Sequence, residues 1–322
     1  MIPADPVTVV ICAYTEERWA VLGDAVDAAR KQLRAGDELI VVVDHNERLR
    51  ARCADAFGEA RVLANEHRRG LSGARNTAVA QARGSIVVFL DDDAIPLDGW
   101  LDALRAPYAD PGVFGVGGVA RPRWPGGAPE GAPEGAPGRA PGWFPDEFGW
   151  VVGCSHRGLP PAAQPVRNLL GATMSFRAAA FEQAGLFCED LGRVPEQPLG
   201  GEETEFCIRL TRVRPGAVLR FDPAARVEHV MTPARARLGY FVRRCWSEGV
   251  SKAEVTRRAG AGQGLSTERA YTTRVLPRAV ARGLADGARG DVQGLGRAAA
   301  VVLGLAVTTA GYGAGTVRGR VR

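Results

Sequence analysis

The sequence feature that most restricts the fold is the apolar run Ile86–Leu90, which the carboxylates Asp91, Asp92 and Asp93 follow directly. The run is short and rich in β-branched residues, which favours a strand buried on both faces of a parallel sheet. Open α/β sheets bind ligands at the carboxyl ends of such strands. Adjacent carboxylates repel one another, and Mg²⁺ or Mn²⁺ is a common counter-ion. The aspartates therefore predict a divalent-metal site; a solvated acidic turn is the alternative.

Strands and helices alternate along the N-terminal part of the chain. Apolar strands are predicted at Val7–Cys12 and Leu39–Val43, a third begins at Val62, and helical periodicity covers Trp19–Leu33. This alternation predicts an α/β protein with a Rossmann-like, doubly wound and mostly parallel sheet. No Gly-x-Gly-x-x-Gly follows the first strand, so side chains and a metal, not a glycine-rich loop, would hold a nucleotide.

Composition limits the class of protein. The 322 residues are 46% hydrophobic and 24% charged, which fits one large or two smaller globular domains. Six scattered cysteines without a Cys-x-x-Cys pair predict free thiols in a reducing compartment, and the N-terminus shows no signal peptide. We therefore expect a cytoplasmic protein. Basic and aromatic residues do not interleave as they do in nucleic-acid-binding modules, so no nucleic acid is expected as a partner.

A loop with two glycines precedes the aspartates. Gly70 and Gly73 permit a tight turn, and Ser72 is the expected N-cap of a helix that continues through Gln81. Arg75 then lies near the helix start, where a cation opposes the helix dipole. An arginine in that place often binds an anion, and phosphate fits its planar fork. An ordinary surface arginine is the alternative.

Four motifs occur in order along the chain: Tyr14-Thr15-Glu16 after the first strand, Asp44 after the second, Ala74-Arg75-Asn76, and Phe89-Leu90-Asp91-Asp92-Asp93. Together they resemble the motifs of family 2 glycosyltransferases, and the resemblance covers roughly the first two-thirds of the chain. The resemblance implies a glycosyltransferase A-type domain that binds a nucleotide-diphosphate sugar, with a UDP-sugar favoured. It also implies Mn²⁺ or Mg²⁺ as the cofactor.

The resemblance also implies a role for each matching residue. Tyr14, Glu16 and Asp44 would line the nucleoside pocket, and Arg75 would lie near the diphosphate. The first aspartate of the Asp-x-Asp motif would lie near the ribose and the last would bind the metal. Some relatives use a histidine as a further metal ligand, and His229 matches it. The expected nucleotide-sugar-binding residues are Tyr14, Thr15, Glu16, Asp44, Arg75, Asn76, Asp91 and Asp92, and the expected metal ligands are Asp93, Asp91 and His229.

A second acidic cluster starts a predicted helix near Glu202. In the resembling family an acidic pair at a helix start supplies the general base. Glu203 matches the catalytic position, although Asp is commoner there. Inverting transfer needs one carboxylate within hydrogen-bond reach of the attacking hydroxyl. Glu203 is therefore the expected base, and we interpret Glu202 and Glu205 as partners of the helix dipole.

We predict a catalytic domain over residues 1–235 and a basic helical region over 236–322. The segment 122–145, dominated by Gly, Pro and Ala, predicts a mobile loop. The aromatic residues that follow it are expected either to line an acceptor groove or to join the core.

The C-terminal region determines the expected partners. Tyr240–Gly249 resembles a motif of relatives that glycosylate polyprenyl-linked or cell-envelope acceptors, which implies a glycan or lipid-linked acceptor. Ala298–Val317 has no charged residue, yet it is mostly Ala, Gly and Thr, so its insertion energy is marginal. We expect a helix that docks on an anionic membrane surface, on the inner face of the cell membrane, or on a second copy of the chain. A packing helix in the soluble core is the alternative.

These features together predict a metal-dependent inverting glycosyltransferase. A sugar-1-phosphate nucleotidyltransferase is the first alternative, but such enzymes usually carry a Gly-rich basic loop after the first strand, unlike Ala13-Tyr14-Thr15-Glu16. A degenerate, non-catalytic nucleotide-sugar-binding module is the second alternative. The joint presence of Asp91, Asp93, Glu203 and Arg75 argues against it.

Overall fold

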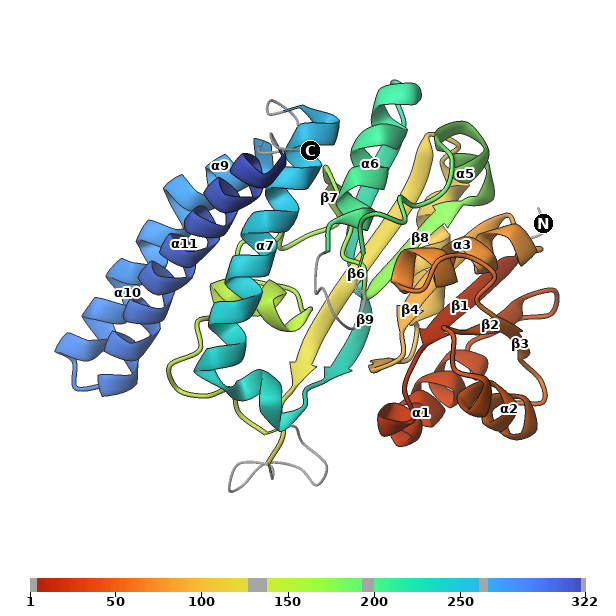
Figure 1. Ribbon diagram of the computed structural model, residues 1–322, viewed down its shortest axis with the longest axis horizontal. Coiled ribbons are helices and arrows are strands. Elements are labelled where there is room, and N and C mark those ends of the chain that lie inside the picture. Colours follow the sequence, from red (N-terminus) through yellow and green to blue (C-terminus); the bar gives the residue numbers. More distant parts are fainter. Residues whose placement is uncertain (1–4, 127–137, 193–199, 261–265, 320–322) are drawn as a thin grey trace. The chain divides into compact units, whose positions relative to one another are not determined.

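The computed structural model describes residues 5–126, 138–192, 200–260 and 266–319 (Figure 1). Its contacts divide the chain into two compact units. Unit 1 comprises Met1–Ala120 and Pro160–His229, and unit 2 comprises Arg121–Leu159 and Val230–Arg322. The second unit thus takes in residues 121–159 in addition to the predicted C-terminal region. Of the predicted mobile loop, residues 127–137 lie outside the described residues.

Unit 1 is built on a mixed β-sheet with the strand order β3-β2-β1-β4-β8-β6-β9-β5, and β7 pairs with β9. The strands β3, β2, β1 and β4 are parallel, as predicted, whereas the pairs β4–β8, β8–β6, β9–β5 and β9–β7 are antiparallel. The strands are β1 (Val7–Ala13), β2 (Glu38–Val43), β3 (Arg61–Ala64), β4 (Ile86–Asp91), β5 (Ala94–Pro96), β6 (Val113–Arg123), β7 (Gln164–Pro165), β8 (Thr173–Arg177) and β9 (Val218–Val230).

Helices and 3₁₀ turns connect these strands. They are η1 (Glu16–Arg18), α1 (Trp19–Arg30), α2 (Glu47–Ala56), α3 (Leu71–Gln81), α4 (Trp100–Arg105), η2 (Ala106–Ala109), α5 (Ala178–Ala184) and α6 (Glu202–Val213). Gly70 has φ 130°, and α3 begins directly after it. The prediction that Ser72 caps this helix is therefore wrong: Ser72 lies inside α3, is buried, and donates a hydrogen bond to the Leu191 carbonyl at 2.6 Å.

The central strands are buried on both faces, as their continuous apolar runs predict. Val9 lies opposite Leu39 and Val88 in register, and the three belong to one core cluster, together with residues of α1, α2 and α4. Val10 and Phe89 point to the other face and pack with residues of α3, α5 and α6. Because successive side chains of a strand alternate in direction, one apolar run supplies two cores. This arrangement confirms the predicted α/β fold.

Unit 2 is mainly helical within its described residues. Its elements are η3 (Asp146–Val152), η4 (Pro233–Ala236), α7 (Leu238–Ala259), α9 (Ser266–Ala270), the π-helical turn η5 (Tyr271–Val275), α10 (Leu276–Ala288) and α11 (Val292–Gly319). Its core contains Phe144, Phe148 and Phe241, whose rings pack edge to face or tilted against one another. Phe144, at the end of the predicted loop, and Phe148, just after it, therefore join a core, which was one of the two expectations for the aromatic residues there.

Helix α11 packs closely along α7 and α10 (Figure 1). Gly249 of α7 lies so near α11 that a Cβ there would be 2.1 Å from the Thr308 carbonyl oxygen and 2.6 Å from the Tyr312 nitrogen. Gly311 of α11 similarly lies against the backbone of Trp246. The small residues thus allow two helix backbones to approach closely.

The segment 292–317 of α11 is also long and apolar enough to cross a membrane by length and composition, with a mean hydropathy of 1.5.

We predict that Gly249→Ala destabilises unit 2, because the added methyl group would collide with backbone atoms that cannot rotate away. Overpacking costs about 1–3 kcal/mol, and the better helix propensity of Ala returns about 1 kcal/mol. Differential scanning calorimetry should therefore show a lower unfolding midpoint.

Gly239→Ala in the same helix is the matched control, since its Cβ would meet only the Arg243 Nη1 atom at 3.7 Å. We expect this variant to unfold at or above the wild-type midpoint. An equal decrease in both variants would mean that close helix packing is not the cause.

Candidate active site

The parallel strands bring the residues that are predicted to bind the nucleotide sugar to one edge of the sheet. Ala13 is opposite Val43, and Cys12 is opposite Asp91, so β1, β2 and β4 end at the same level. Tyr14 and Asp44 follow the first two of these strands directly. This is the edge at which open α/β sheets bind ligands. Burial raises the pKa of the Cys12 thiol to about 12, so Cys12 stays neutral here.

Asp91, Asp93 and His229 form a candidate metal site. One ligand atom from each lies within 4.8 Å of the other two. His229 Nε2 is 2.5 Å from Asp93 Oδ1 and 3.9 Å from Asp91 Oδ2. The histidine reaches the aspartates because β9 pairs with β5, where it lies opposite Ala94. Two carboxylates and an imidazole suit Mn²⁺ well, and Mg²⁺ less well because it prefers oxygen ligands.

Arg18 adds a cation that the sequence analysis missed. Its Nη1 atom is 2.5 Å from Asp92 Oδ1 and 3.2 Å from Asp93 Oδ2, and its guanidinium lies over the Tyr14 ring. Burial raises the pKa of Asp92 to about 7, against the lowering effect of Arg18, and the neighbouring Asp93 and Asp91 raise it further. The Asp92 Oδ2 atom is buried and has no hydrogen-bond partner among the described residues. The only signal for Arg18 in the sequence is its place just after the first strand motif.

Arg75 is buried, so the alternative of an ordinary surface arginine is wrong. Its Nη1 atom is 2.9 Å from Glu202 Oε1, and its Nη2 atom donates to the Gly171 carbonyl at 3.0 Å and lies 3.5 Å from Asp91 Oδ1. The Phe89 ring lies on the guanidinium as well. Arg75 therefore joins α3, β4 and the start of α6.

The start of α6 supplies both acidic candidates. Glu202 is buried in its ion pair with Arg75, a role that its interpretation as a dipole partner did not include, and its Oε2 atom has no partner among the described residues. Glu203 is half-buried, and its carboxyl carbon lies 3.9 Å from the Cβ position of Gly171. The Arg75 Nη2 atom lies 3.4 Å from that same position. The side chains of Glu203 and Arg75 thus both lie beside Gly171. Glu205 instead pairs with Arg209.

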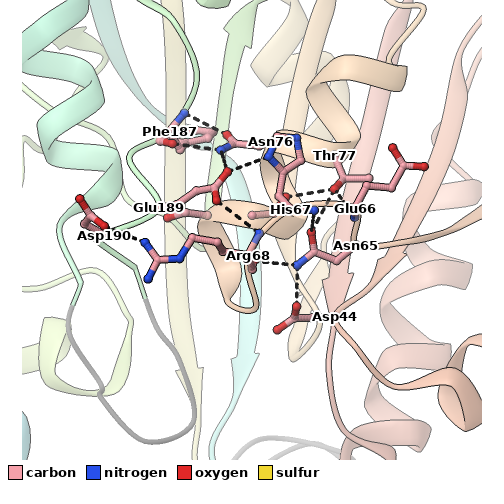
Figure 2. Close-up of polar contacts among 12 residues, drawn as sticks. Asp44, Asn65, Glu66, His67, Arg68, Asn76, Thr77, Phe187, Glu189 and Asp190 are labelled. Carbon is pink, nitrogen blue, oxygen red and sulfur yellow. Dashed lines mark hydrogen bonds and ion pairs between the residues drawn. The ribbon is translucent and has the colours of Figure 1, made fainter.

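Asp44 is held by several donors at the end of β2, one of which, Asn65, is seen in Figure 2. Its Oδ1 atom accepts from Asn65 Nδ2 at 2.6 Å and lies 2.9 Å from His45 Nδ1, and its Oδ2 atom accepts from the Gly70 amide at 2.9 Å. His45 has φ 49°, a left-handed conformation that is uncommon outside glycine and that costs energy. The Asp44 carboxylate is thus fixed in position.

The other residues that are predicted to bind the nucleotide sugar lie in different environments. Tyr14 is 43% exposed. The Thr15 hydroxyl accepts from the Glu17 amide and caps η1. Glu16 pairs with Arg48 at 3.2 Å, and also with Arg52. Their roles in nucleotide-sugar binding remain predictions.

Asn76 and Glu189 connect α3 to the segment before α6 (Figure 2). The Asn76 side chain donates to the Phe187 carbonyl at 3.0 Å and accepts from the Phe187 amide at 2.9 Å. Glu189 Oε1 lies 2.7 Å from His67 Nδ1, and Oε2 accepts from the Arg68 amide at 3.3 Å. Burial raises the pKa of Glu189, but the hydrogen bonds from Asn76, Arg68 and His67 outweigh it and hold the pKa below its usual range.

We predict that Glu189→Gln lowers the free energy of unfolding by about 1 kcal/mol at neutral pH, because the ionised carboxylate accepts these hydrogen bonds. The pKa of Glu189 is depressed in the folded state, so the carboxylate stabilises the protein above its unfolded-state pKa. That contribution is lost as the pH falls through the lower, folded-state pKa. Urea unfolding of both proteins between neutral and acidic pH measures this difference.

Glu47→Gln is the control for this measurement. Glu47 pairs with Arg50 on an exposed helix face, and we expect little change in stability at any pH. A pH-independent loss in Glu189→Gln would show that the amide and its shape, not the charge, determine the effect.

Comparisons with known proteins agree with this fold. The family model described as "Glycosyl transferase family 2" matches residues 8–133. A glucosyl-dolichyl phosphate glucuronosyltransferase of Haloferax volcanii is 31% identical over 250 residues, which cover 76% of this chain and 76% of that protein. A pre-mycofactocin glycosyltransferase of Mycobacterium tuberculosis is 28% identical over 194 residues, or 59% of this chain, and this chain spans only 37% of that relative.

Solved structures show the same fold. The mannosyltransferase PcManGT of Pyrobaculum calidifontis, in complex with GDP-Man and Mn²⁺, matches with a TM-score of 0.58 and 21% identity over 96% of this chain and 88% of its own. GalNAc-T7 with UDP, GalNAc and Mn²⁺ matches with a TM-score of 0.56 and 18% identity, covering 85% of this chain and 58% of its own.

The fold is therefore that of the A-type glycosyltransferases. Within that class, the chain belongs to glycosyltransferase family 2 and is an enzyme of that family.

We predict that Mn²⁺ stabilises the wild-type protein and that Asp93→Asn and His229→Ala lose this stabilisation, because each removes a candidate ligand. A ligand at about 100 times its Kd stabilises the folded state by about 2.7 kcal/mol. Thermal unfolding with and without Mn²⁺ gives the shift.

Asp98→Asn removes an exposed carboxylate from the turn after β5 and should keep the full Mn²⁺ shift. An unchanged shift in both ligand variants would contradict the proposed site.

Proposed function

We propose that the protein is a metal-dependent, inverting glycosyltransferase that moves a sugar from a nucleotide-diphosphate sugar to an acceptor. The observation that carries the proposal is the candidate metal site of Asp91, Asp93 and His229, beside a centre where Arg75 and Glu203 meet. Membership in glycosyltransferase family 2 supports the reaction class.

The donor is a UDP-sugar in this proposal. The sheet edge at which β1 and β2 end is followed by Tyr14, Thr15, Glu16 and Asp44. There the Asp44 carboxylate, which is fixed in position, can accept a hydrogen bond from the nucleotide base. GalNAc-T7, solved with UDP, supports this choice, whereas PcManGT, solved with GDP-Man, supports only a nucleotide-diphosphate sugar in general. The Asp92 Oδ2 atom is the one buried carboxylate oxygen of the aspartate triplet for which the described residues offer no partner.

A divalent cation would be held by Asp91, Asp93 and His229. When bound, it supplies positive charge against the diphosphate that departs with the nucleotide. Arg18 pairs with Asp93 and with the neighbouring Asp92, and its positive charge offsets the repulsion between these carboxylates. Arg75 keeps Asp91 and the start of α6 together, so the general base keeps its place relative to the metal ligands.

Glu203 is the general base in this proposal. Inversion requires the acceptor oxygen to attack directly, and a carboxylate near that oxygen removes its proton. Glu202 is less suitable because its Oε1 atom is paired with the Arg75 guanidinium. A lipid phosphate acceptor is already ionised at neutral pH and would not need the base, whereas a hydroxyl would. The two acceptor classes therefore differ in their dependence on Glu203.

The acceptor is a lipid-linked or glycan molecule in this proposal. The support is the similarity to the Haloferax volcanii protein, whose name includes glucosyl-dolichyl phosphate. The basic C-terminal region adds charge that suits a lipid phosphate. We place the protein in the cytoplasm, peripheral on the inner face of the cell membrane.

We predict that one donor from a panel of UDP-, GDP- and TDP-sugars is slowly hydrolysed in the presence of Mn²⁺, and that Asp93→Ala abolishes this release of nucleoside diphosphate. Loss of a ligand removes the charge that stabilises the leaving group. Pyrophosphate release from a nucleoside triphosphate and a sugar phosphate would instead indicate a nucleotidyltransferase.

Glu203→Gln should retain the slow donor hydrolysis but lose about 10²–10⁴-fold of the transfer to a hydroxyl acceptor. Glu205→Gln, at the same helix end, is the control and should retain transfer because Glu205 is paired with Arg209. Full transfer by Glu203→Gln to a hydroxyl acceptor would contradict the role of Glu203.

A further inference from the structure

Helix α11 has one face that no described residue covers. Its buried side packs on α7 and on aromatic residues of the unit 2 core, where Gly304 lies against Phe148. Its other side exposes large apolar side chains in water. These are Val292, Leu295, Val302, Leu303, Leu305 and Val317, with exposures of 76, 48, 58, 38, 37 and 64%.

Between Ala298 and Val317 this exposed face lacks the charged residues that a soluble surface helix carries. From Ala298 to Val317 the sequence has no charged residue, so both the buried and the exposed sides are apolar or small. Helices that are apolar all round are normally enclosed by protein or lipid. A contiguous exposed apolar face marks an interaction site. The face therefore requires a partner.

The charge of the region indicates which partner this is. Residues 236–322 hold 15 Lys or Arg and only 5 Asp or Glu, whereas the whole chain has a net charge of +5. Exposed arginines occur on both of the helices that pack against α11, for example Arg243 on α7 and Arg278 on α10. A second copy of the chain would bring the same positive charge to the interface and be repelled. An anionic lipid surface is complementary to it.

The packing of α11 also decides how it would lie. The helix is docked along α7, since Gly249 and Gly311 bring the two backbones into contact. Helix α7 carries Lys252, which is ion-paired with Glu248 at 3.2 Å and with Glu268 at 2.8 Å. If α11 crossed the bilayer, these charges would be drawn towards the hydrocarbon at high cost. A helix with one apolar face free therefore lies in the plane of the interface.

We propose that the exposed face of α11 docks the protein, lying flat, on a bilayer that contains anionic phospholipids. Trp246 of α7 is 41% exposed next to α11 and is placed to enter the headgroup layer. This surface deepens the proposed function, on which its biological purpose rests, because it would bring unit 2 to the membrane that contains a lipid-linked acceptor.

The test is co-sedimentation of the full-length protein with two kinds of vesicle, one of phosphatidylcholine alone and one that also contains phosphatidylglycerol. We expect binding to the anionic vesicles, release at high salt, and weak binding to the neutral vesicles. The variant Val302→Asp with Ala306→Asp places two carboxylates on the exposed face and should weaken binding about tenfold or more.

The control variant is Ala51→Asp with Ala54→Asp, on exposed positions of α2 in unit 1. It changes the net charge by the same amount away from α11 and should bind like the wild type. Circular dichroism on both variants verifies the fold. Because vesicle binding needs neither donor nor acceptor, its failure would leave the proposed reaction intact, and a failed donor panel would leave the docking surface intact.

Four outcomes would overturn the proposal. The first is equal binding to neutral and anionic vesicles, and the second is an equal loss in the control variant. The third is binding that resists high salt and alkaline extraction, as a membrane-spanning helix would. The fourth is no vesicle binding together with a dimer, seen by sedimentation velocity, that the α11 variant dissociates; this would assign the face to a second copy.

Discussion

The site depends on the balance of charge at the end of β4. Three successive carboxylates lie there, and Asp92 and Asp93 are buried, which without compensation would destabilise the fold. Arg18 approaches them from the end of β1, and Arg75 approaches Asp91 from α3. Each cation comes from an element adjacent to β4, so the charges are compensated by the same packing that builds the sheet. The site is therefore a consequence of the sheet and not an addition to it.

The same ion pairs connect α3 and α6, two helices of unit 1 that are far apart in the sequence. Arg75 bonds Glu202 at the start of α6, far along the chain from α3. Glu202 thereby positions its neighbour Glu203, and removing either member of this buried pair would leave the other charge unpaired. The segment before α6 is held in addition by Glu189 and Asn76 (Figure 2). The candidate base at the start of α6 and the candidate metal site at the end of β4 thus share one set of contacts.

The sequence predicted those parts that depend on short-range pattern. The run Ile86–Leu90 has strand length and apolar continuity, and both properties are local, so the strand and its burial were predictable. His229 was matched only through a family resemblance, because its approach to Asp93 depends on β9 pairing with β5. The ion pairs of Arg18 and Glu202 were not predictable from local pattern, since their partners are distant in sequence. Ser72 misled because one positive φ at Gly70 started the helix earlier.

The contrast between the two units follows from what each must bury. In unit 1, the sheet encloses its apolar runs on both faces, and the polar residues gather at the strand ends, where a nucleotide sugar would be recognised. In unit 2, the small residues of α11 allow close packing on one side of the helix only. A sequence selected only for solubility would place charges on the other side at little cost to the core. Because these charges are absent while arginines are abundant nearby, the composition of α11 fits the proposed contact with a surface that is both apolar and anionic.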